Sequence, residues 1–178
     1  MNIKKLLLFT YCLLGSPLVF AVNGPDPVLR VNLEFTAVIV DPTCVVRNDS
    51  QNILVNLNVW DTGSIVRVGD RTRAIPFSIY LSDCEADTVA VSFVGPQDQN
   101  DTNLLALNNS STAQGVAVEI LDKDRQQIPI NEYSLPESVN NNATTDIKLD
   151  FFANYVATND RVTAGRAHAT ATFKIDYN

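Results

Sequence analysis

Two cysteines offer the clearest chemistry in this chain. Cys44 and Cys84 lie 40 positions apart, and the third cysteine, Cys12, belongs to an N-terminal leader. In an oxidising compartment, two cysteines permit only one intramolecular disulfide. Closing a loop of that length contributes about 4 kcal/mol in the chain-entropy model. The alternative is two separate buried thiols, because a tetrahedral metal site would need further ligands.

The other residues that could do chemistry do not form a site. His168 is the only histidine, which excludes a Ser-His-Asp triad at any other position and every multi-histidine metal site. It lies on the polar side of an alternating strand pattern, so we expect an exposed strand residue. Asp122 and Asp124 predict a solvated hairpin turn rather than an acid–base pair. A last group of carboxylates lacks the spacing and glycine of a calcium loop: Asp83, Glu85 and Asp87. We therefore expect no enzymatic activity, no metal site and no cofactor.

The first 21 residues predict a secretory signal peptide. Lys4 and Lys5 form a basic start, Leu6–Leu14 is a short apolar run, and Val19–Ala21 offers a small-residue cleavage site. Removing 21 of the 178 residues leaves 157, which suits one domain. The leader takes two of the 13 basic residues with it, so the mature chain has 11 basic and 20 acidic residues and a net charge of −9.

This composition excludes two classes of partner. An acidic domain repels phosphates, so we expect no nucleic-acid binding. The leader is the only long apolar run, and a membrane span needs about 20 apolar residues, so we expect no transmembrane anchor.

Apolar residues alternate with polar ones along most of the mature chain, which predicts strands. Polar breakers separate the alternating stretches, and no stretch keeps a helical period for three turns. Several short strands and one disulfide are typical of an all-β sandwich of immunoglobulin type. The predicted strands are Ile53–Val59, Ile75–Leu81, Val89–Phe93, Val116–Ile120, Ile147–Tyr155 and Ala167–Tyr177.

One more amphipathic strand precedes the first cysteine. Its apolar residues share one phase and span roughly 27–30 Å at about 3.3 Å per residue. It is either the first strand of the sandwich or a strand offered to another molecule, and the pattern leaves both open. The inward-phase residues are Leu29, Val31, Leu33, Phe35 and Ala37.

Blocks spread over the whole mature chain resemble the pilin subunits of chaperone–usher fimbriae, of the type 1 and S-fimbrial kind. Each block is short, but they occur in order, include both cysteines and end with a penultimate tyrosine. The blocks are Phe35–Cys44, Ile75–Cys84, Asn103–Asn108 with Gly115–Val118, Leu149–Tyr155 and Ala164–Tyr177.

The resemblance implies an incomplete immunoglobulin-like sandwich that lacks its final strand and is completed by donor-strand complementation. Residues 1–21 would be the signal peptide, 22–37 the donor-strand extension and 38–178 the pilin domain. The donor residues would be the five inward-phase residues named above. The resemblance thus favours strand donation over an ordinary first strand. One groove edge, which also binds the chaperone, would carry Ala169, Ala171, Phe173, Ile175 and Tyr177. The other edge would come from the strand that leads into Cys44.

The resemblance also implies partners and a location. A periplasmic chaperone would lend a strand, an outer-membrane usher would exchange it, and neighbouring pilins would take its place in a fimbria on the bacterial surface. The mid-chain and C-terminal blocks are similar to minor or tip-adaptor pilins, with the major shaft pilin as an alternative. Ala37 stands where the family usually has Gly, whose missing Cβ permits close backbone approach. A self-complete secreted β-sandwich that binds glycan or protein is the competing hypothesis.

Overall fold

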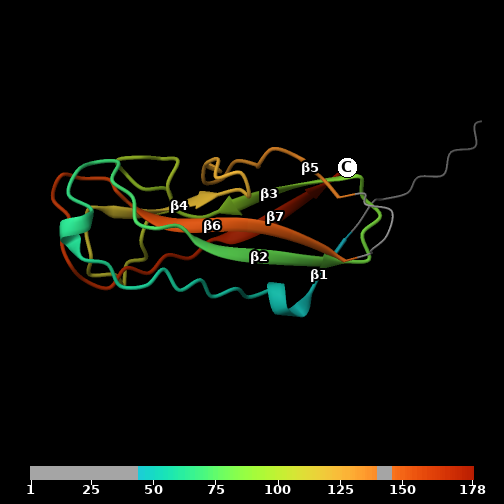
Figure 1. Ribbon diagram of the computed structural model, residues 1–178, viewed down its shortest axis with the longest axis horizontal. Helices are drawn as coiled ribbons and strands as arrows, with labels where there is room; N and C mark the ends of the chain where they lie inside the picture. Colours follow the sequence, from blue (N-terminus) through green and yellow to red (C-terminus); the bar gives the residue numbers. More distant parts are fainter. Residues whose placement is uncertain (1–43, 140–145) are drawn as a thin grey trace, which may run out of the picture. The chain divides into compact units, whose positions relative to one another are not determined.

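The computed structural model describes residues 44–139 and 146–178, and these form an all-β sandwich of two antiparallel sheets (Figure 1). One sheet has the order β1-β2-β6-β4 and the other β5-β3-β7. The predicted leader and the predicted amphipathic strand before Cys44 lie outside the described residues. The strands are β1 (Val45–Val46), β2 (Ile75–Ser82), β3 (Thr88–Val94), β4 (Val116–Leu121), β5 (Glu137–Ser138), β6 (Ile147–Ala157) and β7 (Thr172–Tyr177).

Four strands predicted from alternation are confirmed as β2, β3, β4 and β6. Pro76 lies inside β2, opposite Phe152 of β6. On the other side of β2, β1 pairs only with Leu81 and Ser82, so the ladder there does not reach Pro76. The missing proline N–H therefore removes no bond to β1, as expected for proline beside an open edge.

The core lies between the two sheets. Ile79 and Leu81 of β2 are completely buried. Phe77 and Phe151 are cross-strand partners in one sheet, with ring centroids 5.6 Å apart. Phe93 of the other sheet meets both rings, at 6.0 Å from Phe77 and 5.2 Å from Phe151. Such aromatic contacts add about 0.5–1.5 kcal/mol each beyond area burial, so this cluster ties the sheets together.

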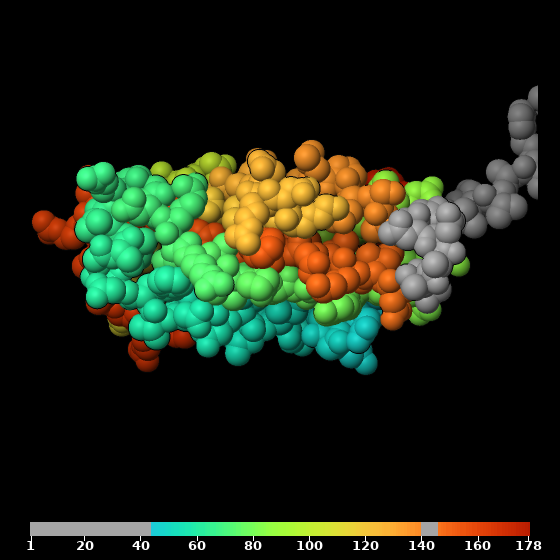
Figure 2. Space-filling view, viewed as in Figure 1, coloured from blue at the N-terminus to red at the C-terminus, as the bar shows by residue number. Residues whose placement is uncertain are grey.

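The sandwich has two distinct ends. At the disulfide end, Val46, two residues after Cys44, pairs with Leu81, which also pairs with Ile147 at the start of β6. At the far end, β6 finishes at Ala157. Gly69 reaches that point, with its N–H donating to the Ala157 carbonyl at 2.8 Å. The 3-10 helix η3 (Thr62–Ser64) lies at the far end, away from the C-terminus, and its neighbouring loop covers that end in the space-filling view (Figures 1 and 2).

Candidate functional site: a groove along the open edge of the sandwich

A groove of about 810 Å³ runs between the C-terminal segment and residues 51–57. We call it the edge groove. Its floor consists of core side chains from both sheets, among them Phe77 of β2 and Phe93 of β3. The groove thus opens directly onto the core, and an apolar side chain placed in it would contact the residues that hold the sheets together.

The first edge of the groove is the C-terminal segment. β7 pairs with β3 in the register Val89↔Tyr177 to Val94↔Thr172. Within the part of the chain that the structure describes, β7 is the last strand of its sheet, so its second side carries no ladder. An open strand edge presents unpaired N–H and C=O groups to another strand.

The five residues predicted for this edge alternate with exposed ones and are all half-buried against the core. The groove lining includes Ala169, Ala171 and Phe173, whereas Ile175 and Tyr177 lie further toward the disulfide end. Strand geometry begins only at Thr172, so the predicted start of this strand at Ala167 is wrong.

The stretch before β7 is fixed by a loop rather than by a sheet. Thr112 and Ala113 donate their N–H groups to the Arg166 carbonyl at 2.9 and 3.1 Å. The Tyr155 hydroxyl donates to the Ala167 carbonyl at 2.7 Å, and burial raises the pKa of this phenol. Gly165 lies so close to this loop that a Cβ would come within 2.4 Å of the Ala113 nitrogen. These contacts fix residues 165–167, which precede β7 along this edge, although these residues do not form a strand.

The second edge, residues 51–57, has no backbone–backbone hydrogen bond to another described residue. Ile53 and Val55 are half-buried and Leu57 is buried, while Leu54 points outward and is 96 % exposed. The predicted strand Ile53–Val59 is therefore wrong as secondary structure, and Val59 is 98 % exposed rather than inward. The segment has the side-chain pattern of a strand without the ladder.

The second groove edge was expected from the strand leading into Cys44, and that strand lies outside the described residues. Among the described residues, the second edge comes from residues after Cys44. The alternation of Ile53, Val55 and Leu57 was the signal for this segment, which follows the 3-10 helix η2 (Asn48–Ser50).

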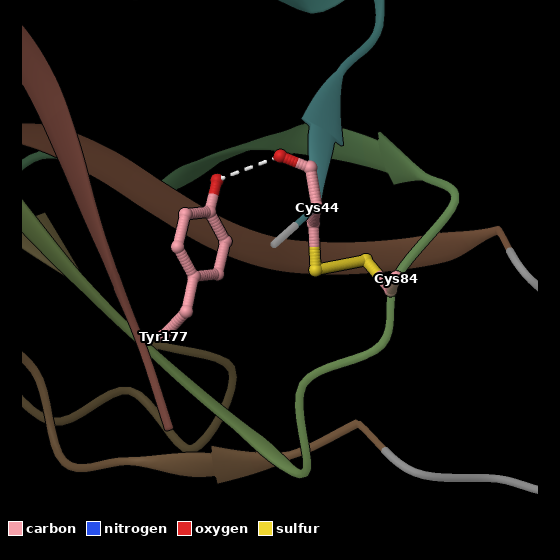
Figure 3. Close-up of a disulfide and its surroundings, with 3 residues drawn as sticks. All are labelled: Cys44, Cys84 and Tyr177. Carbon is pink, nitrogen blue, oxygen red and sulfur yellow. Dashed lines mark hydrogen bonds between the residues drawn. A yellow bond between two sulfur atoms is a disulfide. The ribbon is translucent and has the colours of Figure 1, made fainter. Parts of the chain in front are cut away.

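Both edges are tied together at the disulfide end (Figure 3). Cys44 and Cys84 form the predicted disulfide. The Tyr177 hydroxyl donates to the Cys44 carbonyl at 3.1 Å, and burial raises the pKa of this phenol. The bond joins the last strand to the start of the segment that becomes the second edge.

The five predicted donor residues, Leu29, Val31, Leu33, Phe35 and Ala37, lie outside the described residues. Among residues 44–139 and 146–178, no group of three or more His, Cys, Asp or Glu could hold a metal ion. In the same part of the chain, no helix is long and apolar enough to cross a membrane. His168 is exposed, and its backbone N–H donates to the Ser111 hydroxyl at 3.0 Å.

The sequence of this chain is similar to those of known proteins. The family model described as "Fimbrial protein" matches residues 33–178. The chain is 35 % identical to the fimbrial-like protein FimF of Salmonella typhimurium, over all of both chains. It is 37 % identical to the fimbrial subunit type 1 of Salmonella typhimurium, covering 86 % of each chain.

Solved structures show the same fold. A type I fimbria protein of Burkholderia pseudomallei is 28 % identical, with a TM-score of 0.60 over 78 % of this chain and 91 % of that chain. The P pilus rod subunit PapA is 17 % identical, with a TM-score of 0.63 over 76 % of this chain and 99 % of that chain. The second likeness is one of fold alone.

Proposed function

This chain belongs to the fimbrial protein family, and we propose that it polymerises by accepting a neighbour's strand in its edge groove and donating its own N-terminal strand. The observation that carries the proposal is the groove itself. Among the described residues, the side of β7 away from β3 carries no ladder and residues 51–57 have no backbone–backbone hydrogen bond, and the floor of the groove is the core.

A strand inserted in the groove would supply a ladder partner for the open side of β7 and would cover the core side chains on the groove floor. Its backbone would bond the open side of β7, and its alternate side chains would enter the groove. The donor residues Leu29, Val31, Leu33, Phe35 and Ala37 share the phase this requires. A slip of one residue would turn all five outward, so the apolar pattern sets the register.

The same groove is a hazard before assembly. Exposed apolar surface beside an open strand promotes aggregation. Fimbrial subunits reach the cell surface through the periplasm, and we propose that a periplasmic chaperone lends a strand to the groove on the way. An outer-membrane usher would then exchange this strand for the extension of the next subunit. In this proposal residues 1–21 are the signal peptide, 22–37 the donor extension and 38–178 the pilin domain.

We further propose a structural role without catalysis, as a minor or tip-adaptor subunit. The named relatives are fimbrial subunits rather than enzymes. The resemblance of the mid-chain and C-terminal blocks to adaptor pilins supports the minor position. The 37 % identity to a type 1 fimbrial subunit keeps the major shaft subunit as the second candidate.

Deleting Val22–Phe35 tests the donor role. The truncated chain should fold, bind the chaperone and accept a donor, but it should fail to enter the groove of another subunit. If the segment were an ordinary first strand, its removal would strip several apolar side chains worth roughly 1.5–3 kcal/mol each when buried. Because total stability is about 5–15 kcal/mol, a chain that never folds would contradict the proposal.

Expression without a chaperone distinguishes this proposal from the competing hypothesis, a self-complete secreted binding module. A self-complete sandwich should be a soluble monomer under those conditions. A subunit with an open groove should aggregate or be degraded, and co-expression with a fimbrial chaperone should restore its yield.

A further inference from the structure

A second cavity lies on the opposite face of the β1-β2-β6-β4 sheet from the edge groove. Val118 and Ile120 of β4 line the edge groove, whereas Glu119 between them lines the second cavity. In β6, Ala153 lines the groove and Asn154 lines the cavity. Successive side chains of a strand point to opposite faces, so the sheet separates the two cavities. The second cavity has a volume of about 450 Å³, and we call it the outer pocket. Its lining includes Arg71, Glu119, Leu121, Arg125, Gln127 and Asn154.

The outer pocket contains a buried ion pair. Glu119 is the only charged residue of β4 and is 2 % exposed. Its carboxylate accepts hydrogen bonds from Nε and Nη2 of Arg71, at 2.9 and 3.1 Å, and from Nδ2 of Asn154, at 3.1 Å. Replacing a buried ion pair by apolar residues of similar volume often leaves stability unchanged or raises it, so stability alone does not account for this pair. A charged group in the middle of an apolar strand is instead typical of a functional site.

The hydrogen bonds of this network are incomplete. Asn154 is 1 % exposed, and its Oδ1 has no hydrogen-bond partner among the described residues. Nearly all buried polar atoms in proteins are paired, so this oxygen lacks a donor. Arg71 is the exposed member of the network, with 55 % of its side chain open to solvent. A ligand hydroxyl that entered beside Arg71 would supply the missing donor.

Arg125, on the turn after β4, brings unused donors to the outer pocket. Its backbone lies in the left-handed region, at φ 62°. The Asp122 carboxylate fixes this turn by accepting the N–H groups of Asp124 and Gln126, at 2.9 and 2.8 Å. The Arg125 guanidinium stacks on the Phe152 ring, 4.0 Å from its centroid, and has no hydrogen bond or ion pair within the part of the chain that the structure describes. Backbone strain of this kind clusters at functional sites, and a stacked guanidinium presents its donors in a fixed plane.

The charges around the outer pocket do not favour an ionised ligand. Glu119 neutralises Arg71, and its hydrogen bonds and charge raise the pKa of this guanidinium. Arg125 is the other cation among the described residues that line the pocket, and the acidic Asp122 and Asp124 flank it in the same turn. The whole chain has a net charge of −7, which repels anions. The outer pocket therefore suits a neutral ligand.

The remaining groups of the outer pocket suit a ligand with neighbouring hydroxyls. The guanidinium of Arg125 and the amide of Gln127 are planar and each can bond two hydroxyls at once. Leu121 adds a half-buried apolar side chain against which C–H groups can pack. Pockets for small ligands have volumes of roughly 300–1,000 Å³, so this pocket has room for one sugar ring. A hexose is neutral, carries neighbouring hydroxyls and has a C–H face.

We propose that the outer pocket binds a neutral hexose unit of a glycan. Arg125 and Gln127 would bond neighbouring hydroxyls, and a further hydroxyl would donate to Oδ1 of Asn154 beside the pair of Arg71 and Glu119. This inference goes beyond donor-strand exchange and does not rest on it, because the sheet separates the outer pocket from the edge groove. A strand inserted in the groove would leave the pocket unfilled, so one subunit would hold a neighbour and a sugar at the same time.

The test titrates the isotope-labelled mature chain, held in its chaperone complex, with the methyl glycosides of glucose, galactose and mannose. We expect at least one of these sugars to bind with a millimolar Kd and to shift the amide signals of residues 71–74 and 119–127. Glucuronate, a sugar of similar size that carries a carboxylate, should bind more weakly than that hexoside. Only the labelled chain is observed, so sugar bound to the chaperone would not be mistaken for sugar in the pocket.

Two substitutions of Arg125 and one control locate the contact. Arg125→Ala should weaken sugar binding at least about tenfold. Arg125→Lys keeps the charge but loses the planar fork, so it should weaken binding as well. Arg73→Ala is the matched control, because Arg73 is exposed and lies on the same segment as Arg71 but does not line the pocket. The control should bind the sugar within about twofold of wild type. Amide spectra of the sugar-free variants should match wild type outside the turn, which shows that they are folded.

Several results would overturn the inference. One is the absence of shifts with all three neutral hexosides, and another is a set of shifts confined to residues outside the outer pocket. Tighter binding of glucuronate than of every neutral hexoside would contradict the neutral class of ligand. Undiminished binding by Arg125→Ala, or equal weakening by Arg73→Ala, would place the contact elsewhere. None of these results bears on the donor-strand function, which is tested through the edge groove.

Discussion

The two edges of the groove are built from similar side-chain patterns but reach different structures. β7 alternates half-buried and exposed residues and pairs with β3 over six positions. Residues 51–57 alternate in the same way along most of their length, yet they have no ladder within the described chain. Alternation sets which side chains face the core, whereas a strand also needs a neighbour for its backbone. We call β7 the finished edge of the groove, because it pairs with β3, and residues 51–57 the unfinished edge, because they have no ladder among the described residues.

The disulfide is the element on which both edges depend, so removing it should have the largest effect. Cys44→Ala with Cys84→Ala should lower the free energy of unfolding by roughly 2–5 kcal/mol. The physical reason is the loss of a cross-link that closes 40 positions and anchors the start of the second edge. Thermal melting of the chaperone-bound domain measures this, and reduction of the wild type by dithiothreitol should reproduce it. Unchanged melting in both cases would show that the anchor lies elsewhere.

The finished edge should be sensitive to charge on its inward phase only. Phe173→Asp places a carboxylate against the core and should cost about 2–4 kcal/mol unless the side chain escapes to water. Lys174→Asp, one position on and exposed, is the matched control and should be neutral within about 0.5 kcal/mol. The yield of chaperone complex from the periplasm measures both. Equal yields for the two variants would count against the assignment of β7 as the groove edge.

The bond between the edges can be removed without disturbing the fold. Tyr177→Phe should cost about 0.5–1.5 kcal/mol, because only the hydroxyl that donates to the Cys44 carbonyl is lost. Burial raises the pKa of Tyr177 in the folded state, so its contribution is complete below about pH 10, the unfolded value, and falls as pH rises through the folded pKa. The variant should therefore lose less stability than wild type between pH 9 and 11. Identical pH profiles for Tyr177→Phe and wild type would contradict this role.

The unfinished edge should show smaller effects than the finished edge, because it has fewer contacts to lose. Leu54→Asp is on the outward phase and should change stability by less than about 0.5 kcal/mol. Val55→Asp, its half-buried neighbour, should cost about 1–2 kcal/mol. Urea unfolding measures the loss of stability in each variant and so distinguishes the outward-facing position from the inward-facing one. A larger loss for Leu54→Asp would mean that the segment is turned the other way.

Sequence reasoning could predict what depends on local pattern and on counting. It predicted the disulfide, since only two cysteines remain after the predicted leader, and the four strands β2, β3, β4 and β6, in which apolar residues recur at every second position. It missed β5, because Glu137 and Ser138 lie in a polar stretch and become a strand only by pairing with Val89 and Thr88.

The remaining errors concern contacts between residues far apart in the chain. Residues 51–57 were predicted as a strand because alternation does not report whether a ladder partner exists. The pair of Arg71 and Glu119 joins positions 48 apart, and a single acidic residue in an apolar strand gives no sign of its partner. These features are set by tertiary structure rather than by local pattern.

The central claim is that the edge groove accepts this family's donor strand in one register. The most direct test measures binding of a synthetic peptide, Asp26–Val40, to the chain released from its chaperone, together with hydrogen exchange along both edges. The account predicts that the peptide binds and slows exchange in residues 53–57 and 173–177. Arg at position 36 in place of Thr36 should be tolerated, and Arg at position 35 in place of Phe35 should abolish binding. A peptide that leaves both edges unprotected, or one that binds equally well with Phe35→Arg, would contradict the account.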